Sequence, residues 1–187
     1  YCSSLFFHLC LSGIKKAVYG NIGKAEDVQN VLQNSGEGIG LFRTEFLFMD
    51  RQSEPSEEEQ FEAYSTVAKA MDGKEVIIRT LDVGGDKDIP YLNIEKEENP
   101  FLGHRAIRYC LDNKELFKKQ LRALLRASVY GNIKIMLPLV TCVEDVRQAK
   151  ALIEECKEEL KSEGKEYRSV DVGIMVETPA AVFISDI

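Results

Sequence analysis

The sequence predicts an α/β fold in which a parallel sheet is built from alternating strands and helices. From Lys16 onward, short apolar runs of strand length alternate with longer amphipathic stretches. The short runs are nearly continuous in apolar residues, as is typical of buried parallel strands. Strands that alternate with helices form βα units, which are joined by right-handed crossovers. The 44% of hydrophobic and 29% of charged residues are also typical of a globular chain.

Five strands are predicted along the chain, each bounded by a turn or a helical pattern. They are the segments Ala17–Tyr19, Ile39–Phe42, Val76–Arg79, Ile133–Leu137 and Val172–Val176. A short helix around Val28, Val31 and Leu32 is expected to end near Gly36. Three pairs of residues with the spacing of a capping box predict longer helices: Ser56 with Glu59, Asp112 with Glu115, and Thr141 with Glu144. Gly164 is expected to end the last of these.

Polar residues at the strand ends favour a closed barrel over an open sheet. Asn21, Arg43, Arg79 and Glu177 each lie at or just past the carboxyl end of a different predicted strand. In a βα barrel these positions converge on the face where active sites are built, whereas an open sheet brings fewer of them together. We therefore expect a TIM-type (β/α)8 barrel.

The length allows only part of such a barrel. Eight units take about 250 residues, so residues 17–187 correspond to about the first five βα units. We expect an incomplete barrel over residues 17–187, preceded by a segment, residues 1–16, that matches no known pattern. Because later units would be missing, we expect the chain alone to be inactive.

Composition excludes several classes of function. The net charge of −7 and a pI near 5.0 argue against a nucleic-acid binder, although a small basic pocket remains compatible with them. No apolar run reaches the roughly 18 residues that a membrane-spanning helix needs, and the run from Leu5 to Leu11 lacks the preceding basic residues of a signal peptide. Five cysteines without metal-ligand spacing, and two distant histidines, are typical of a cytoplasmic protein with reduced thiols.

Two arginines follow predicted strands and are candidate anion ligands. Arg43 ends the second strand, and Arg79 ends the third before a loop that contains Gly84 and Gly85. Guanidinium groups bind phosphate or carboxylate through two parallel hydrogen bonds. Like charges on one face repel, so an anion is expected between them. Alternatively, Arg43 pairs with Glu45 or Asp50, and the two glycines form a plain turn rather than a point of close backbone approach.

Two further elements carry charges with more than one interpretation. Arg105 and Arg108 are three residues apart and are expected to share a helix face, either at a binding site or in solvent. Glu177 follows the fifth strand, and Pro179 is expected to start the next helix. Glu177 could neutralise an arginine, act as an acid or base, or bind a divalent ion, since Mg²⁺ commonly takes one or two carboxylates together with substrate phosphate oxygens.

Four stretches together resemble enzyme I of the bacterial sugar phosphotransferase system, the phosphoenolpyruvate–protein phosphotransferases. They read LFRTEFLFMDR, IIRTLDVGGDK, EENPFLGHRAIR and MVETPAA. The resemblance extends from about Gly20 to Ala181. Pyruvate-phosphate dikinases and phosphoenolpyruvate synthases share the barrel but match less well through FLFMDR and GGDK. A dikinase or synthase relative is therefore the alternative within the same barrel family, and a non-catalytic anion-sensing or partner-binding module is the alternative outside it.

The resemblance implies specific roles for four residues. Arg43 and Arg79 would bind the phosphate of phosphoenolpyruvate, Arg105 would line the same site, and Glu177 would be a Mg²⁺ ligand. In this family the phosphoryl group passes through an enzyme histidine to a small histidine-phosphorylatable carrier protein for sugar uptake. The family enzymes are cytoplasmic homodimers.

The same comparison also shows departures from the family pattern. Neither His8 nor His104 lies in the family's phosphohistidine motif. The second Mg²⁺ ligand, a further phosphate-binding arginine and the proton-donating cysteine belong to segments that follow the matched region in the family. No catalytic residue is therefore assigned within this chain.

Overall fold

In the computed structural model, residues 16–84, 89–92 and 94–187 are described, and they contain one five-stranded sheet. Its strands are β1 (Tyr19–Ile22), β2 (Gly38–Arg43), β3 (Glu75–Arg79), β4 (Asn132–Leu137) and β5 (Asp171–Ile174). Every neighbouring pair is parallel, and the order in the sheet follows the order in the chain. A sequential order has no switch point, unlike a doubly wound sheet. The prediction of an α/β fold with about five βα units of a barrel is confirmed.

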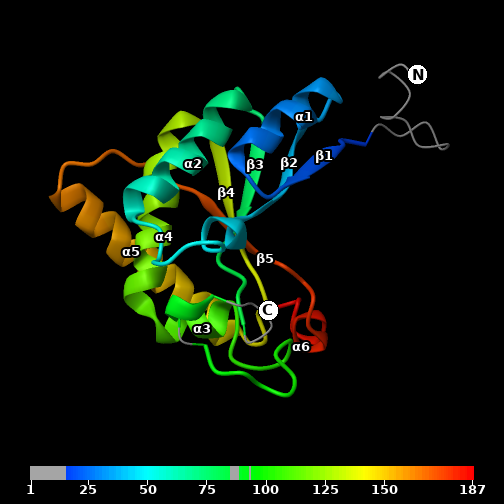
Figure 1. The fold of residues 1–187 in the computed structure, drawn as a ribbon, viewed down its shortest axis with the longest axis vertical. Coiled ribbons are helices and arrows are strands. Elements are labelled where there is room, and N and C mark those ends of the chain that lie inside the picture. The colour runs from blue at the N-terminus through cyan, green and yellow to red at the C-terminus, as the bar shows by residue number, and fades with distance from the viewer. Residues whose placement is uncertain (1–15, 85–88, 93) are drawn as a thin grey trace.

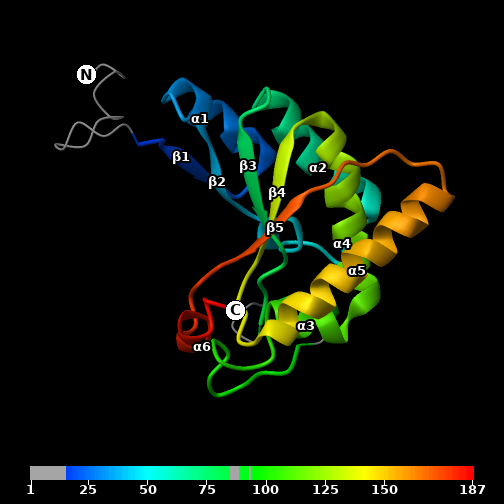
Figure 2. The same ribbon diagram turned by 180° about the vertical axis from the view of Figure 1, so that it is seen from behind.

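Within the described ranges, six α-helices connect or follow these strands. They are α1 (Val28–Gln33), α2 (Glu57–Ala70), α3 (Ile107–Asp112), α4 (Lys114–Ala127), α5 (Val143–Ser162) and α6 (Pro179–Phe183). Short 3₁₀ helices span Ala25–Asp27, Thr44–Leu47, Pro90–Leu92 and Ser128–Tyr130. Helices α2, α4 and α5 lie side by side along the sheet, whereas α3 and α6 lie beyond the carboxyl ends of the strands (Figures 1 and 2).

The two faces of the sheet differ in what covers them. On β3 and β4, Val76, Ile78, Ile133 and Ile135 alternate with less buried neighbours and form the core beneath the helices. On β2, Phe42 lies on this helix side, with its ring edge-on to Tyr64 of α2 at a centroid distance of 5.9 Å. The alternate strand residues face the inner side of the barrel wall. Arg43 and Arg79 belong to this inner set.

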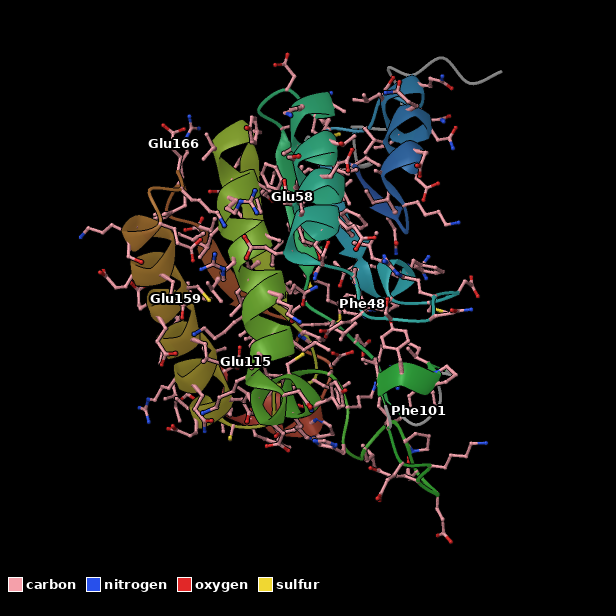
Figure 3. The ribbon with its side chains drawn as sticks, turned by 60° about the vertical axis from the view of Figure 1, so that its left-hand side comes forward. Phe48, Glu58, Phe101, Glu115, Glu159 and Glu166 are labelled. Atoms are coloured by element: carbon pink, nitrogen blue, oxygen red, sulfur yellow. The ribbon has the colours of Figure 1, made fainter. Side chains whose placement is uncertain are left out.

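The outer surface of the helices is held together by charge pairs (Figure 3). Arg122 of α4 donates to Glu57 of α2 at 2.6 Å and to Glu159 and Glu163 at 3.1 and 2.7 Å. Arg126, one turn further along α4, donates to Glu57 and to Glu58, at 2.7 and 2.8 Å. One row of arginines on the central helix therefore joins both neighbouring segments.

The start of α2 is the predicted one. The hydroxyl of Ser56 accepts a hydrogen bond from the backbone N–H of Glu59 at 3.2 Å, and the Glu59 carboxylate accepts one from the backbone N–H of Ser56 at 2.8 Å. These reciprocal bonds lower the pKa of Glu59 to about 2, with the bond from the Ser56 backbone as the main cause and Arg51 as the second. The capping box is confirmed.

The other two predicted helix starts are each wrong by one residue. Helix α5 begins after Cys142, and Asp145 rather than Glu144 accepts bonds from the backbone N–H groups of Thr141 and Cys142, at 2.9 and 3.1 Å. Asp112 does not open α4 but ends α3, because a break at Asn113 separates the two helices. In both places several polar residues compete for the same backbone groups, and the path of the chain decides between them.

The first strand begins two residues later than predicted. It includes Gly20, where an added Cβ would lie 2.4 Å from a methyl group of Val31. Glycine here lets α1 pack directly on β1. The predicted stop at Gly164 is confirmed, because this residue adopts a φ of +68° just after α5. Residues 1–15 of the predicted N-terminal segment lie outside the described residues. Among the described helices, none combines the length and apolar character that a membrane crossing requires.

Candidate functional site

The predicted site residues Arg43 and Arg79 lie next to each other at the same end of the sheet. Each is the last residue of its strand, and their Cα atoms are partners in the β2–β3 register. Register partners direct their side chains to the same face. The fold therefore directs the side chains of both arginines to the inner face, where the strands end.

Arg79 is held in a buried arrangement of charges. Its Nη2 donates to Glu45 Oε1 at 2.8 Å, and its Nη1 lies 3.0 Å from Asp82 Oδ2. All three side chains are at least 90% buried. Asp82 also accepts a hydrogen bond from Arg105 Nε at 2.8 Å, so that Arg79 and Arg105 share one carboxylate. Paired and hydrogen-bonded charges of this kind retain their charge and orientation inside a protein.

Arg43 is arranged differently from Arg79. Of the two pairings considered from sequence, neither forms: Glu45 is paired with Arg79, and the described part of the chain contains no ion pair to Arg43. The guanidinium carbon lies 4.8 Å from the centre of the Phe46 ring, a cation–π contact. Arg43 is half-buried and forms no ion pair with a described residue. Its charge acts only weakly on Asp27, because the pKa of Asp27 is lowered mainly by the backbone N–H groups of Gly23 and Lys24 and least by Arg43. This leaves it suited to an anionic ligand.

Arg105 does not share a helix face with Arg108, as had been predicted. It precedes α3, and the two side chains diverge, because Arg108 donates to the backbone oxygens of Leu102 and Gly103 at 2.7 and 2.8 Å. The guanidinium carbon of Arg105 lies 5.0 Å from the centre of the Phe101 ring, which is exposed in the loop before α3 (Figure 3). The following backbone is strained, since Ala106 adopts a φ of +53°.

The loop after β3 approaches Arg105 closely. A Cβ added to Gly84 would lie 2.7 Å from the Cβ of Arg105. The backbone N–H of Ala106 also donates to the carbonyl of Val83 at 3.0 Å. Close backbone approach is therefore the correct interpretation of Gly84, whereas Gly85 lies outside the described residues.

Glu177 lies at the same end of the sheet, after β5. Its Oε1 accepts a hydrogen bond from the backbone N–H of Leu139 at 2.7 Å, and Leu139 has a φ of +54°. Within the described residues Glu177 forms no ion pair with an arginine, so that role, considered from sequence, is wrong. The next residue, Thr178, caps α6 and donates to the carbonyl of Val140 at 2.6 Å. These contacts orient Glu177 while leaving its side chain exposed.

A complete metal site is not formed by the described residues. No group of three or more His, Cys, Asp or Glu side chains converges there as metal ligands would. His104, next to Arg105 in the chain, instead lies with its Nε2 2.8 Å from Asp112 Oδ2 and its ring against Tyr109.

Several buried polar atoms at the strand ends lack hydrogen-bond partners. They are Arg43 Nε, Glu45 Oε2, Arg79 Nε and Thr80 Oγ1. All four belong to the last residue of β2 or β3 or to one of the next two residues. Such atoms are normally satisfied by ordered water or a ligand, so their clustering here is typical of a polar binding site.

Sequence reasoning missed the two carboxylates that organise this site. Glu45 was considered only as a partner of Arg43, and Asp82 was not singled out. A usable signal was present, because each acid follows a strand-end arginine by two or three residues. Which arginine each acid contacts depends on the strand pairing and could not be read from that spacing.

Comparison with known proteins agrees with this geometry. The family model described as "PEP-utilising enzyme, PEP-binding domain" matches residues 6–187. The phosphoenolpyruvate-protein phosphotransferase of Priestia megaterium is 57% identical over 168 residues, 89% of this chain and 29% of that protein. The proteins of the same name from Listeria monocytogenes and Bacillus subtilis are each 54% identical, over 93% and 89% of this chain and 31% and 29% of their own lengths.

This chain therefore spans less than a third of the curated relatives that it matches. The matched segment includes all five strands and the four predicted site residues. The resemblance to enzyme I inferred from the four motifs is confirmed. With the family model covering nearly its whole length, the chain belongs to the phosphoenolpyruvate-binding domain family of the phosphoenolpyruvate-utilising enzymes.

Proposed function

We propose that this chain binds phosphoenolpyruvate at the carboxyl end of its sheet, through Arg43, Arg79 and Arg105. The observation that carries the proposal is the register pairing of Arg43 with Arg79, in which Arg79 is fixed by carboxylates while Arg43 forms no ion pair with a described residue. Glu45 and Asp82 offset only part of the positive charge of the three arginines, so a net positive charge remains at this end of the sheet. A phosphate group neutralises that charge and accepts hydrogen bonds from guanidinium groups.

We further propose that residues 17–187 act as the phosphoenolpyruvate-binding part of a phosphotransferase. The relatives described above, which are phosphoenolpyruvate-protein phosphotransferases, support this assignment. In the whole protein the phosphoryl group would move from phosphoenolpyruvate to an enzyme histidine and then to a small carrier protein that serves sugar uptake. The whole protein would be a cytoplasmic homodimer. Phosphoryl transfer requires positioning and charge neutralisation rather than covalent participation by the barrel. The arginines provide both.

Glu177 is the proposed Mg²⁺ ligand of this chain. The donor set fits such an ion in part, because Mg²⁺ commonly takes one or two protein carboxylates and completes its shell with water and substrate oxygens. Glu177 is an exposed carboxylate at the same end of the sheet, with one oxygen oriented by the Leu139 amide. When bound, Mg²⁺ would neutralise charge on the phosphate group.

Calorimetric titration of the chain with phosphoenolpyruvate in the presence of Mg²⁺ tests the proposal. Pyruvate, which lacks the phosphate group, is the matched ligand control. We expect phosphoenolpyruvate to bind and pyruvate not to bind at the same concentrations. Arg147→Ala removes an equally charged side chain from the exposed surface of α5 and should leave the affinity unchanged. Equal affinity for the two ligands, or none for either, would contradict the assignment.

A further inference from the structure

Gln120 is a fully buried amide on an otherwise apolar face of α4. Its exposure is 0%, as is that of its helix neighbours Phe117, Leu121 and Leu124. A buried amide costs stability unless its donors and acceptor are satisfied. Gln120 is not one of the predicted site residues. Anion binding by the arginines does not by itself explain why an amide is buried at this position.

All the polar groups of this amide are engaged across three elements. Its Oε1 accepts a hydrogen bond from the backbone N–H of Leu81 at 2.9 Å. Its Nε2 donates to Thr44 Oγ1 and to the hydroxyl of Tyr64, both at 3.1 Å. The orientation of the amide is determined, because the N–H of Leu81 can only donate and must therefore face the oxygen.

The bonds of Gln120 lead to both strand ends of the proposed site. Thr44 follows Arg43, and its hydroxyl donates in turn to the backbone oxygen of Arg79 at 2.8 Å. Leu81 directly precedes Asp82, the carboxylate shared by Arg79 and Arg105. The β2–β3 register ends at the pair of Arg43 and Arg79. Just beyond that pair, the side chain of Gln120 joins the segment that follows β2 to the segment that follows β3.

The series of hydrogen bonds continues from Tyr64 to Gln60 and Pro55. The hydroxyl of Tyr64 donates to Gln60 Oε1 at 3.1 Å, and the Gln60 amide donates to the carbonyl of Pro55 at 3.2 Å. Burial raises the pKa of the Tyr64 hydroxyl far above its usual range, so the hydroxyl stays protonated. A protonated hydroxyl donates to Gln60 while it accepts from Gln120, as the two bonds require.

We propose that Gln120 is a positioning residue for the anion site, which sets the spacing of Arg43 relative to Arg79 and Asp82. This role rests on the proposed function, because it assumes that the three arginines bind phosphoenolpyruvate. Gln120 itself does not touch the ligand. Its effect passes through Thr44 to Arg43 and Arg79, and through Leu81 to Asp82.

The test compares variants that keep the packing but remove these bonds. Gln120→Met keeps a side chain of similar length without a polar end, and Thr44→Val replaces only the hydroxyl. Thr44→Ser is the conservative partner that retains it. Ser128→Ala is the matched control, because the buried hydroxyl of Ser128 donates to Leu125 O at 2.6 Å at the opposite end of the sheet. Each variant is titrated with phosphoenolpyruvate and Mg²⁺ well below its unfolding temperature.

We expect Gln120→Met and Thr44→Val to weaken phosphoenolpyruvate binding by about 10- to 100-fold, by analogy with the loss of hydrogen-bond partners that orient metal ligands. Thr44→Ser should recover most of the affinity, and Ser128→Ala should lower the unfolding temperature without changing affinity. If Gln120→Met does not fold, the Thr44 pair decides. Unchanged affinity in Thr44→Val, or in a folded Gln120→Met, overturns the positioning role alone. Absence of binding by the unsubstituted chain overturns the proposed function and this role with it.

Discussion

At the scale of single residues, Arg43 and Arg79 have the same charge and strand position but different surroundings. Arg79 lies between Glu45 and Asp82, and removing it leaves the buried Glu45 without its ion-pair partner and Asp82 with Arg105 alone. Arg43 has only the Phe46 ring beside its guanidinium group among the described contacts. The two arginines should therefore differ in what they contribute to folding, even if both bind the same ligand.

We predict that Arg43→Gln weakens phosphoenolpyruvate binding by about 1.5–3 kcal/mol, the loss of a charge-assisted hydrogen bond. Its free energy of unfolding should fall by less than about 1 kcal/mol. Arg79→Gln should weaken binding by a similar amount and also destabilise the fold by about 3–5 kcal/mol, because a buried ion pair is broken. Calorimetry and urea denaturation measure the two quantities separately. Equal destabilisation by both substitutions would show that Arg43 has a structural partner.

The close contact of Gly84 with Arg105 leads to a second prediction. A methyl group at position 84 would overlap the base of the Arg105 side chain, which cannot move as freely as its tip. We expect Gly84→Ala to cost about 1–3 kcal/mol of stability, as overpacking does, and to lower phosphoenolpyruvate affinity. Gly173→Ala on β5 is the control, because an added Cβ there meets nothing within 4 Å. Thermal unfolding of both variants gives the comparison, and a neutral Gly84→Ala would be inconsistent with the packing described.

At the scale of secondary-structure elements, helix starts depend on which of several neighbouring acids reaches the free backbone groups. Asp145 accepts bonds from the N–H groups of Thr141 and Cys142, whereas Glu144 extends outward near Arg147. We predict that Asp145→Ala destabilises the chain by about 1–2 kcal/mol, as expected for loss of a helix cap. Glu144→Ala should change stability by no more than about 0.5 kcal/mol. The reverse order in urea denaturation would favour the assignment made from sequence.

At the scale of the whole molecule, the charge pairs between α2, α4 and α5 make stability depend on pH. Hydrogen bonds from Arg122 and then Lys165 lower the pKa of Glu163 to about 2, and Lys118 and then Arg122 lower the pKa of Glu159. A carboxyl with a lowered pKa binds fewer protons in the folded chain than in the unfolded chain, so acid favours unfolding. Its stabilising contribution is complete above the unfolded pKa near 4.5 and is lost as the pH falls toward 2.

We therefore predict that the free energy of unfolding decreases progressively below about pH 4.5. Urea denaturation at a series of pH values measures this dependence. Arg122→Met removes the guanidinium that pairs with Glu57, Glu159 and Glu163. Its stability should depend less on pH in the same interval. A slope equal to that of the unsubstituted chain would show that these pairs are not the cause.

The sequence alone was sufficient for the strand content, the barrel-type order and the strand-end positions of Arg43 and Arg79. These features depend on apolar patterning and on the end of each pattern, both of which are local along the chain. The four motifs were sufficient to identify the family. Local signals also placed the start of α2, because Ser56 and Glu59 have no close competitor for the same backbone groups.

Only the tertiary structure decided which groups orient the site. Glu45 contacts Arg79 rather than Arg43, which is closer in the sequence, because the pairing of β2 with β3 brings Arg79 within reach of Glu45. Gln120 reaches Thr44 across 76 positions in the chain. Contacts of this kind depend on how helices and strands pack, and no local pattern records them. Sequence therefore determined the family and the position of the arginines, whereas packing determined which of them is paired with buried carboxylates and which forms no ion pair with a described residue.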